Sequence, residues 1–570
     1  MDKVQVRSLS AICVTIVALV MLAFYNWTVI QDQIFYTVVS LQETHQPGSG
    51  ARYVEQPKTA QELIQRLRNT TRSIGLGTTY GMNMSATELE DWQAANPCLS
   101  RSELIPMYAE RKVAKSLPPN PVWDELFAEY SRYHRVCTKS IRDPKGYFVK
   151  KDDSSPCKFL VADVAFGTGL GNKMFTLASG ILYAIMTQRV LLVPTTNLVP
   201  EFTCEPFPGS SWRLDPETFP TPPEQFVTGD GSWILDAEFS DRVDRAMKRE
   251  PKVNGTSLGP LAYAVGVTRH EWQPKGRFYC DTEQRAYSQS IWMYTSGCIY
   301  TIPKLFAIPS FRPVLEGLFP DRMAMTRVVR SLLLPDNTVW DRVRRIHHVY
   351  LSGADRQLGL QVRYRDGREM YNKMNDVVNK RITDCALENG LLPRLTSELN
   401  SKLLAATNTS APNPVVKVFI ASLFPGVHES LSKLYVLKPT VSGEDVGLVQ
   451  ITQDETQEFS LEADRQAFTE VILLSLSDHL MVTPMSTFGG LAQSFGALTP
   501  WFIDYRSESS TSCERSPTVE VCNQFSIKEY SCPHDSDVNG QRIDQVVDYI
   551  KDCPVIDHDL GIQLITDFES

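Results

Sequence analysis

The sequence predicts an α/β protein whose body consists of two lobes, each built around a parallel sheet. In the first lobe, an apolar strand at Phe159–Asp163 leads through a glycine-rich loop and an apolar helix to a second strand, Arg189–Val193. In the second lobe, strands and helices alternate between residues 358 and 503, as they do in doubly wound nucleotide-binding folds. The length of 570 residues agrees with two lobes plus extensions, because single compact cores rarely grow to that size.

The composition is that of a mildly acidic globular protein. The chain is 42% hydrophobic and 22% charged, has a formal net charge of −9 and contains no basic arm or stripe, so it is not expected to bind nucleic acid. Its twelve cysteines include no C-x-x-C pair, which argues against a zinc ribbon, and their dispersed placement indicates disulfides formed in the secretory lumen. Eleven of them follow the N-terminal apolar run, so at least one is free or pairs with another chain.

The N-terminus carries the signals of a membrane anchor. Lys3 and Arg7 precede a mostly apolar run, Leu9–Trp27, which is long enough to cross the roughly 30 Å hydrocarbon core of a bilayer. Because the positive flank is N-terminal, we expect a single-pass type II protein with a cytosolic tail at 1–8, an anchor at 9–30 and its body in the lumen. A cleaved signal peptide is the alternative, although no small-x-small cleavage site closes the run.

The remaining chain divides into a stem, two lobes and a tail. Residues 31–120 are rich in polar residues and are expected to form a stem that is ordered only in parts. The body is expected to comprise an N-terminal, acceptor-side lobe at 121–345, a C-terminal lobe at 346–510 and a cysteine-rich tail at 511–570 that packs on them. Four N-x-S/T motifs agree with a lumenal address and are candidate glycosylation sites: Asn69, Asn83, Asn254 and Asn408.

The N-terminal lobe is expected to begin with an amphipathic helix at Trp123–Cys137. Its glycine loop, Gly167–Asn172, does not fit a dinucleotide fingerprint, because Asn172 takes the place of the third glycine and no acidic residue ends the next strand. The loop either covers a sugar or nucleotide or only allows tight backbone packing. The aromatic loop Glu201–Trp212 also has two interpretations, a carbohydrate-facing surface or a structural loop held by Cys204.

The C-terminal lobe offers an arginine at the end of a strand. Residues 358–362 alternate as a strand does, and Arg363 follows at the carboxyl end, where open α/β sheets bind their ligands. A guanidinium there can hold a diphosphate bidentately and stay charged while a leaving group gains negative charge. The alternative for Arg363 is a surface ion pair. Further strands are expected from residues 415 and 446, and a helix at 464–476.

A second site feature follows at residues 480–503. Leu480–Thr483 is expected to be a short buried strand, and Ser486 or Thr487 to cap a helix over 488–498, before a further strand at 501–503. A turn with hydroxyls at a helix N-terminus can bind a phosphate, because free N–H groups and the helix dipole point at the anion. An ordinary βαβ unit of the core is the alternative.

Several stretches between about residues 155 and 505 resemble, in the same order, motifs of the plant cell-wall fucosyltransferases, the family of xyloglucan α-1,2-fucosyltransferase and its arabinogalactan-directed relatives. The matching stretches are GLGNKMFTLASGILYAIMTQRVLLVP, FTCEPFPGSSW, IPKLFAIPSFRPVLEGLFPD, LLLPDNTVW, LGLQVRYRD and STFGGLAQSFGALTPWFI. The resemblance implies an inverting transferase with two Rossmann-like lobes in a GT-B-like arrangement and a cleft between them. It also implies residence in the Golgi membrane, GDP-fucose as the donor, and no cofactor or metal.

The matched motifs carry over candidate site residues. Arg363 resembles the arginine that binds the donor diphosphate, and Asn172, in the G-x-G-N loop, resembles the residue that faces the cleft between the lobes. The remaining candidates are Gln361, Ser486, Thr487, Phe488 and Gly489 for the donor, and Gly169 and Gly171 on the acceptor side. No catalytic base is identified; Asp281 and His428 are weak candidates.

The residues themselves also favour a mechanism without a metal. A metal-dependent transferase requires an Asp-x-Asp motif at a strand end of the body. The two such motifs, Asp535–Asp537 and Asp557–Asp559, lie in the tail, where we expect them to be solvated. Arg363 and the helix N-terminus at Ser486 can stabilise the departing diphosphate instead.

The chain departs from the family at two positions. Met485 stands where the family usually has Trp, and Cys298 lies in a segment that usually holds an acidic residue beside aromatics. We expect a fucosyltransferase that acts on a galactosyl residue of a cell-wall polysaccharide or proteoglycan. A catalytically inactive lumenal glycan-binding relative, or a transferase with another nucleotide sugar or acceptor, is the alternative. A homodimer or a complex with other Golgi transferases is a possible assembly.

Overall fold

The computed structural model describes most of the chain beyond residue 55. The described residues are Asp244, Lys248, Ser290, Ser526, and 56–75, 84–140, 157–164, 168–215, 263–267, 277–288, 292–297, 300–364, 367–396, 413–453, 458–504, 513–524, 528–554 and 561–568. They all belong to the compact unit Tyr53–Ser570. None of their helices is both long and apolar enough to cross a membrane. The predicted anchor at 9–30 lies outside the described residues.

The N-terminal lobe contains a five-stranded sheet in the order β3-β2-β1-β5-β4, with every pair of neighbours parallel. Its strands are β1 (Lys158–Val164), β2 (Arg189–Pro194), β3 (Arg213–Leu214), β4 (Tyr263–Val267) and β5 (Trp292–Gly297). Helix α7 (Leu170–Met186) connects β1 to β2. The predicted unit of strand, glycine loop, helix and strand is therefore confirmed.

The C-terminal lobe contains a six-stranded sheet in the order β11-β10-β9-β6-β7-β8. Its strands are β6 (Arg356–Gln361), β7 (Val415–Ala421), β8 (Asp445–Gln450), β9 (His479–Val482), β10 (Trp501–Phe502) and β11 (Glu514–Arg515). All pairs are parallel except β10 with β11, which comes from the tail. The strand order reverses between β6 and β9, which is the switch point at which doubly wound sheets bind ligands.

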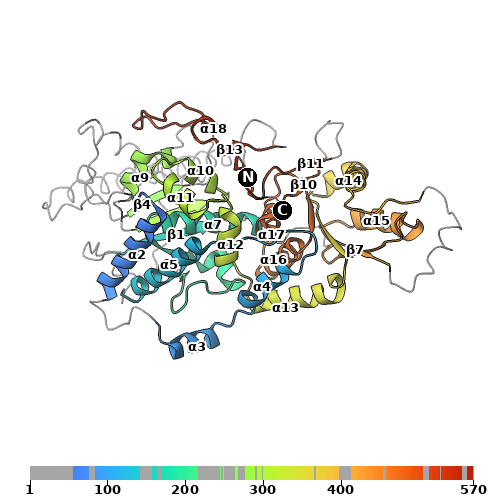
Figure 1. The fold of residues 1–570 in the computed structure, drawn as a ribbon, viewed down its shortest axis with the longest axis horizontal. Helices are drawn as coiled ribbons and strands as arrows, with labels where there is room; N and C mark the ends of the chain where they lie inside the picture. Colours follow the sequence, from blue (N-terminus) through green and yellow to red (C-terminus); the bar gives the residue numbers. More distant parts are fainter. Residues whose placement is uncertain are drawn as a thin grey trace, which may run out of the picture. The chain divides into compact units, whose positions relative to one another are not determined.

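Helices cover both faces of the C-terminal sheet. Helices α14 (Arg368–Glu388) and α15 (Gly426–Leu437) pack with one face in a core of their own. Helices α16 (Leu461–Ser475) and α17 (Thr487–Gly496) cover the other face and share one continuous hydrophobic core with the N-terminal lobe. Figure 1 shows α16 and α17 next to each other, and both also contact α7.

The folded body begins well before Pro121, contrary to the predicted stem at 31–120. Helices α2 (Ala60–Gly75), α3 (Ala86–Ala95) and α4 (Ser100–Ala109) precede α5 (Pro121–Ser140). Leu63 and Leu67 of α2 are fully buried, and α2 packs on α5. Apolar residues recur in α2 at helical spacing, but the polar composition around them concealed this pattern.

Shorter helices complete the N-terminal lobe and lead into β6. They are the 3₁₀-helices η1 (Thr195–Asn197), η2 (Val199–Glu201) and η4 (Arg277–Tyr279), α9 (Asp281–Tyr287), α10 (Ile302–Ala307), α11 (Arg312–Leu318), α12 (Ala324–Leu332), α13 (Asn337–Ile346) and the π-helix η5 (His347–Leu351). Asp336 caps α13 by accepting a hydrogen bond from the backbone N–H of Val339.

The tail packs on the body, as predicted, and is not solvated around Asp535. It contains helix α18 (Ile543–Val546) and an antiparallel sheet of β12 (Asn523–Gln524), β14 (Gly561–Leu564) and β13 (Ile550–Asp552). Ten of the twelve cysteines form disulfides: Cys98–Cys204, Cys137–Cys157, Cys280–Cys532, Cys385–Cys513 and Cys522–Cys553. Cys13 and Cys298 lie outside the described residues.

Candidate functional site

The predicted donor residues lie at the carboxyl ends of two neighbouring strands. Gln361, the last residue of β6, pairs in register with Val482, the last residue of β9. The backbone N–H of Thr483 donates to the carbonyl of Gln361 at 3.1 Å, and the N–H of Arg363 donates to Oγ1 of Thr483 at 3.0 Å. The structure thus brings Arg363 to the switch point of the sheet, although two unconnected parts of the sequence form it.

Helix α17 begins at the same place. Ser486 is its N-cap residue, as predicted, but its side chain makes no capping hydrogen bond. The N–H of Ser486 donates to the carbonyl of Thr483, and the N–H of Gly490 donates to the carbonyl of Ser486. The N–H groups of the first turn have no partner within the helix, so the positive end of α17 can receive an anion.

Met485 has a strained backbone. Its φ is +59°, in the left-handed region that side chains other than glycine and asparagine rarely occupy. Such a residue costs about 1–2 kcal/mol and persists where the surrounding structure requires the turn. The turn from β9 into α17 therefore does not depend on a glycine, and Met485 holds the strained position directly before the helix.

Gln361 and Gly489 touch behind the strand ends. A β-carbon on Gly489 would lie 2.8 Å from Oε1 of Gln361 and 2.9 Å from the side chain of Val482. Oε1 of Gln361 is buried and has no hydrogen-bond partner among the described residues. An unpartnered buried oxygen beside a helix N-terminus marks a place where a polar ligand group can bind.

The glycine loop of the N-terminal lobe contacts the N-terminus of α17, the helix of the candidate donor site. Gly169 is the N-cap of α7, and a β-carbon on Gly171 would lie 2.6 Å from the backbone carbonyl carbon of Thr487. Gly171 is buried, whereas Asn172 is partly exposed. Of the two interpretations of this loop, tight backbone packing is observed, and the backbone it packs against belongs to the candidate donor site.

Because α7 follows β1 and α17 follows β9, this contact places the carboxyl ends of the two sheets toward one another. It also brings two positive helix ends together, which is unfavourable unless negative charge lies nearby. Lys173, in the first turn of α7, forms a 2.6 Å ion pair with Asp464 of α16. Both side chains are largely buried, and burial raises the pKa of Asp464 in spite of the lysine.

A cluster of buried polar groups connects α17 to the tail. No signal in the sequence predicted this cluster. The side chain of Gln493 donates to the backbone carbonyls of Thr518, Val519 and Glu520 in the tail. Glu520 is fully buried and accepts hydrogen bonds from the hydroxyl of Tyr300 and from the N–H of Met325. Burial raises the pKa of Glu520 to about 8.

Two other sequence features have structural roles. The aromatic side chains of the loop 201–212 are buried, so the carbohydrate-facing interpretation is wrong for them; they are Phe202, Phe207 and Trp212. Asp281 accepts hydrogen bonds from the N–H and the hydroxyl of Ser310, which fix the start of α9 to the chain before α11. His428 lies in the first turn of α15.

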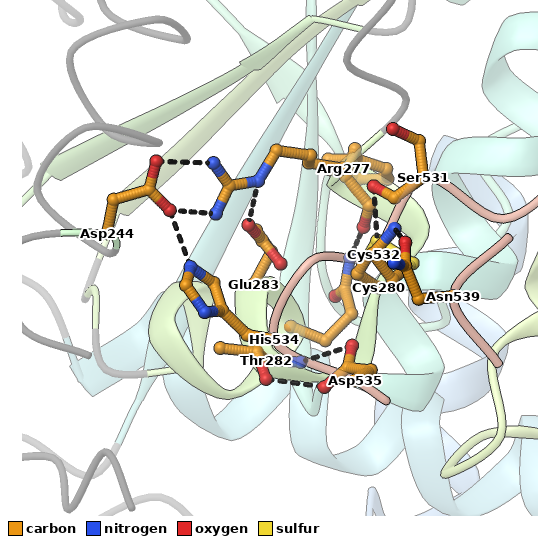
Figure 2. Close-up of polar contacts among 12 residues, drawn as sticks. Asp244, Arg277, Cys280, Thr282, Glu283, Ser531, Cys532, His534, Asp535 and Asn539 are labelled. Carbon is orange, nitrogen blue, oxygen red and sulfur yellow. Dashed lines mark hydrogen bonds and ion pairs between the residues drawn. A yellow bond between two sulfur atoms is a disulfide. The ribbon is translucent and has the colours of Figure 1, made fainter. Parts of the chain in front are cut away.

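One group of described residues brings three potential metal ligands together, namely Cys280, Cys532 and Asp535. The two sulfurs form a disulfide, so neither can bind a metal. Asp535 accepts hydrogen bonds from the N–H and the hydroxyl of Thr282, as Figure 2 shows. The group therefore fastens the tail to α9.

Charged residues surround this attachment. Arg277 donates to Asp244 through both terminal nitrogens and to Glu283 through Nε (Figure 2). His534 of the tail contacts Asp244 at 2.5 Å. The hydrogen bond from Arg277 lowers the pKa of Asp244 to about 2, whereas burial raises that of Glu283 to about 7.

Of the four predicted glycosylation sites, Asn69 lies within the residues that the structure describes. It is exposed on α2, while Thr71 of the same motif is buried. The other three sites, Asn83, Asn254 and Asn408, lie outside the described residues.

Comparison with known proteins decides the family. A model of the xyloglucan fucosyltransferases matches residues 97–532. The chain belongs to the xyloglucan fucosyltransferase family. Among its family relatives, a galactoside 2-α-L-fucosyltransferase of Arabidopsis thaliana is 32% identical over 437 residues, covering 75% of this chain and 74% of the relative. Probable fucosyltransferase 7 of the same plant is 31% identical over 441 residues, covering 76% and 79%.

A solved structure of the family has the same fold. A mutant of Arabidopsis thaliana FUT1 in complex with GDP aligns with a TM-score of 0.67 and 28% identity, covering 82% of this chain and 96% of that one. The resemblance inferred from the motifs is thereby confirmed at the level of the family and of its α/β fold.

Proposed function

We propose that this xyloglucan fucosyltransferase family member transfers fucose, with inversion and without a metal, from GDP-fucose to a galactosyl residue of a cell-wall polysaccharide or proteoglycan. The observation that carries the proposal is the placement of Arg363 next to the uncapped N-terminus of α17. Both are tied to Thr483 at the strand ends where the sheet order reverses. Family relatives named as fucosyltransferases, one of them for galactosides, support the reaction class.

Arg363 and the N-terminus of α17 both stabilise the leaving group. As the bond between fucose C1 and the β-phosphate oxygen breaks, GDP gains negative charge at its diphosphate. The Arg363 guanidinium binds these oxygens bidentately, and the free N–H groups of Thr487–Gly489 bind them at the helix end. The first turn of α7, held against Thr487, adds a second positive helix end. Donors fixed in advance are worth about 3–4 kcal/mol each in the transition state.

The same fixed cation and helix ends favour a mechanism that needs no metal. The two lobes fit a GT-B-like organisation, with donor residues on the C-terminal sheet and acceptor-side residues on the N-terminal one. We further propose a type II Golgi membrane protein anchored by residues 9–30. The five disulfides support an oxidising lumen as the location of the body.

The test uses the full-length chain in detergent, GDP-fucose, a panel of galactosylated acceptors and EDTA. Arg363→Ala is expected to lower kcat by about 10²–10³-fold, in line with the loss of one transition-state donor. The matched control is Arg356→Ala, because Arg356 begins the same strand at its opposite end and pairs with Glu444. We expect the control to retain its rate of transfer.

Three results would contradict parts of the proposal. GDP binding without transfer to any acceptor would favour the inactive glycan-binding alternative, to which the Met485 and Cys298 departures point. Transfer that survives Arg363→Ala would remove the role of the arginine. Loss of activity in EDTA would exclude the metal-free mechanism.

A further inference from the structure

A carboxylate that the motifs did not single out lies at the carboxyl edge of the N-terminal sheet. Asp163 is the last residue but one of β1 and is partly exposed. A β-carbon on Gly180 of α7 would lie 3.1 Å from that of Ala162, so α7 covers the Ala162 face of the strand. Because side chains alternate along a strand, Asp163 points away from α7.

A tyrosine on the neighbouring strand binds this carboxylate. The hydroxyl of Tyr294 in β5 donates to Oδ2 of Asp163 at 2.5 Å, and the N–H of Val164 donates to Oδ1 at 2.8 Å. Val161 is the register partner of Tyr294, and it lies on the same side of β1 as Asp163. The tyrosine side chain therefore extends along the sheet toward the edge.

Burial acts on Asp163, and no lysine or arginine in the described part of the chain compensates for it. Burial raises the pKa of Asp163, while the hydrogen bonds from Tyr294 and Val164 lower it, and no described charged group contributes. Among the described residues Asp163 forms no ion pair with lysine or arginine. A carboxylate of this kind accepts a proton more readily than an ordinary surface aspartate does.

The carboxylate lies where open parallel sheets bind their ligands. β1 and β5 are neighbouring parallel strands, and Asp163 is at the carboxyl end of β1. Because Gly171 contacts Thr487, this edge of the sheet faces α17 of the other lobe. Asp163 thus lies on the edge opposite Arg363 and α17.

We propose that Asp163 is the base that accepts the proton of the galactosyl hydroxyl, and that Tyr294 positions it. This inference rests on the proposed function. The acceptor oxygen forms a bond to fucose C1, the bond between C1 and the phosphate oxygen breaks with its electron pair going to GDP, and the hydroxyl proton moves to Asp163. Each carboxylate oxygen of Asp163 accepts one hydrogen bond, so each keeps a further lone pair that can receive the acceptor proton.

The test compares Asp163→Asn and Tyr294→Phe with the wild-type full-length chain. Asp163→Asn is expected to lower kcat for transfer by about 10²–10⁴-fold, the usual contribution of a general base, while GDP binds with unchanged Kd. The matched control is Glu283→Gln, because Glu283 is a buried carboxyl of the same lobe whose pKa is also raised but which is bound by Arg277. The control should keep its kcat.

Tyr294→Phe is tested through the pH–rate profile, which would not change if Asp163 and Tyr294 had only a structural role. A base must be ionised to act, so the rate rises with pH through the pKa of Asp163. Because the tyrosine hydrogen bond lowers that pKa, its removal should move the acidic limb of the pH–rate profile to higher pH. An unmoved limb, or an Asp163→Asn variant within about threefold of wild type, would overturn the proposal. If wild type itself transfers no fucose, the proposed function fails instead.

Discussion

A β-carbon on Gly171 would lie 2.6 Å from the backbone carbonyl carbon of Thr487, so only glycine allows the first turns of α7 and α17 to meet as they do. Gly171 belongs to the N-terminal lobe and Thr487 to the candidate donor site of the other lobe. This contact links the two halves of the proposed active site through backbone, which cannot yield as the end of a flexible side chain can.

Gly171→Ala is therefore expected to weaken both donor binding and stability. The added methyl group forces Thr487 and the N-terminus of α17 to move, at a cost of about 1–3 kcal/mol for overpacking. The affinity for GDP should fall because the free N–H groups of α17 are displaced. Calorimetric titration with GDP and thermal unfolding measure the two effects.

Gly180→Ala is the matched control for this prediction. Gly180 lies on the same helix, but its β-carbon would approach the Ala162 side chain of its own lobe at 3.1 Å. Gly180→Ala is therefore expected to lower the stability of the protein without changing its affinity for GDP. Equal GDP affinities of Gly171→Ala and wild type would show that the contact does not position the donor helix.

The ion pair of Lys173 with Asp464 is expected to behave as a buried pair. Asp464→Asn leaves the lysine ammonium desolvated without its partner and should lower the free energy of unfolding by about 3–5 kcal/mol. The double variant Lys173→Met with Asp464→Leu removes both charges and should lie much closer to wild type. Urea unfolding of Lys173→Met, Asp464→Leu and the double variant measures the coupling energy of the pair, and additive losses of stability would contradict it.

Much of the fold could be predicted because its signals are local. The strand before the glycine loop, the strand ending at Arg363 and the turn at Ser486 each follow from apolar runs bounded by turn residues. The order of strands around β6 and β9 could not be predicted, because register between distant segments has no local signature. The helix at Ala60–Gly75 was missed because its apolar stripe is narrow within a polar segment.

The candidate site was predictable only in part, for the same reason. Arg363 and the turn at Ser486 were recognisable by their position at strand ends and by their motifs. Asp163 was visible as the end of a buried strand, but its partner Tyr294 lies on another strand that the sequence did not reveal. Likewise, the pairing of Tyr300 with Glu520 connects the lobe to the tail and has no signal in either segment.

The attachment of the tail through Cys280–Cys532 predicts a large loss of stability on removing that disulfide. The two cysteines are 252 positions apart, against 31 for Cys522–Cys553. The chain-entropy model makes the longer crosslink more stabilising by about 2 kcal/mol. Thermal unfolding of Cys280→Ser with Cys532→Ser should therefore show a larger loss than that of Cys522→Ser with Cys553→Ser. The reverse order would mean that the contacts around Asp535 hold the tail without the crosslink (Figure 2).

The buried carboxyl of Glu520 predicts a dependence of stability on pH. Its pKa is about 8 in the folded protein against an ordinary value of 4.5, so between these values the folded chain holds a proton that the unfolded chain releases. Its contribution is therefore fully present below about pH 4.5 and is lost as the pH rises through about 8.

Glu520→Gln tests this dependence because the amide cannot ionise. It can still accept a hydrogen bond from the N–H of Met325 and donate one to the oxygen of Tyr300, so the surrounding core should keep its packing. Between pH 5 and pH 8 the melting temperature of the variant should fall less than that of wild type. Melting curves whose pH dependence is parallel for the two proteins would mean that Glu520 carries its charge in the core.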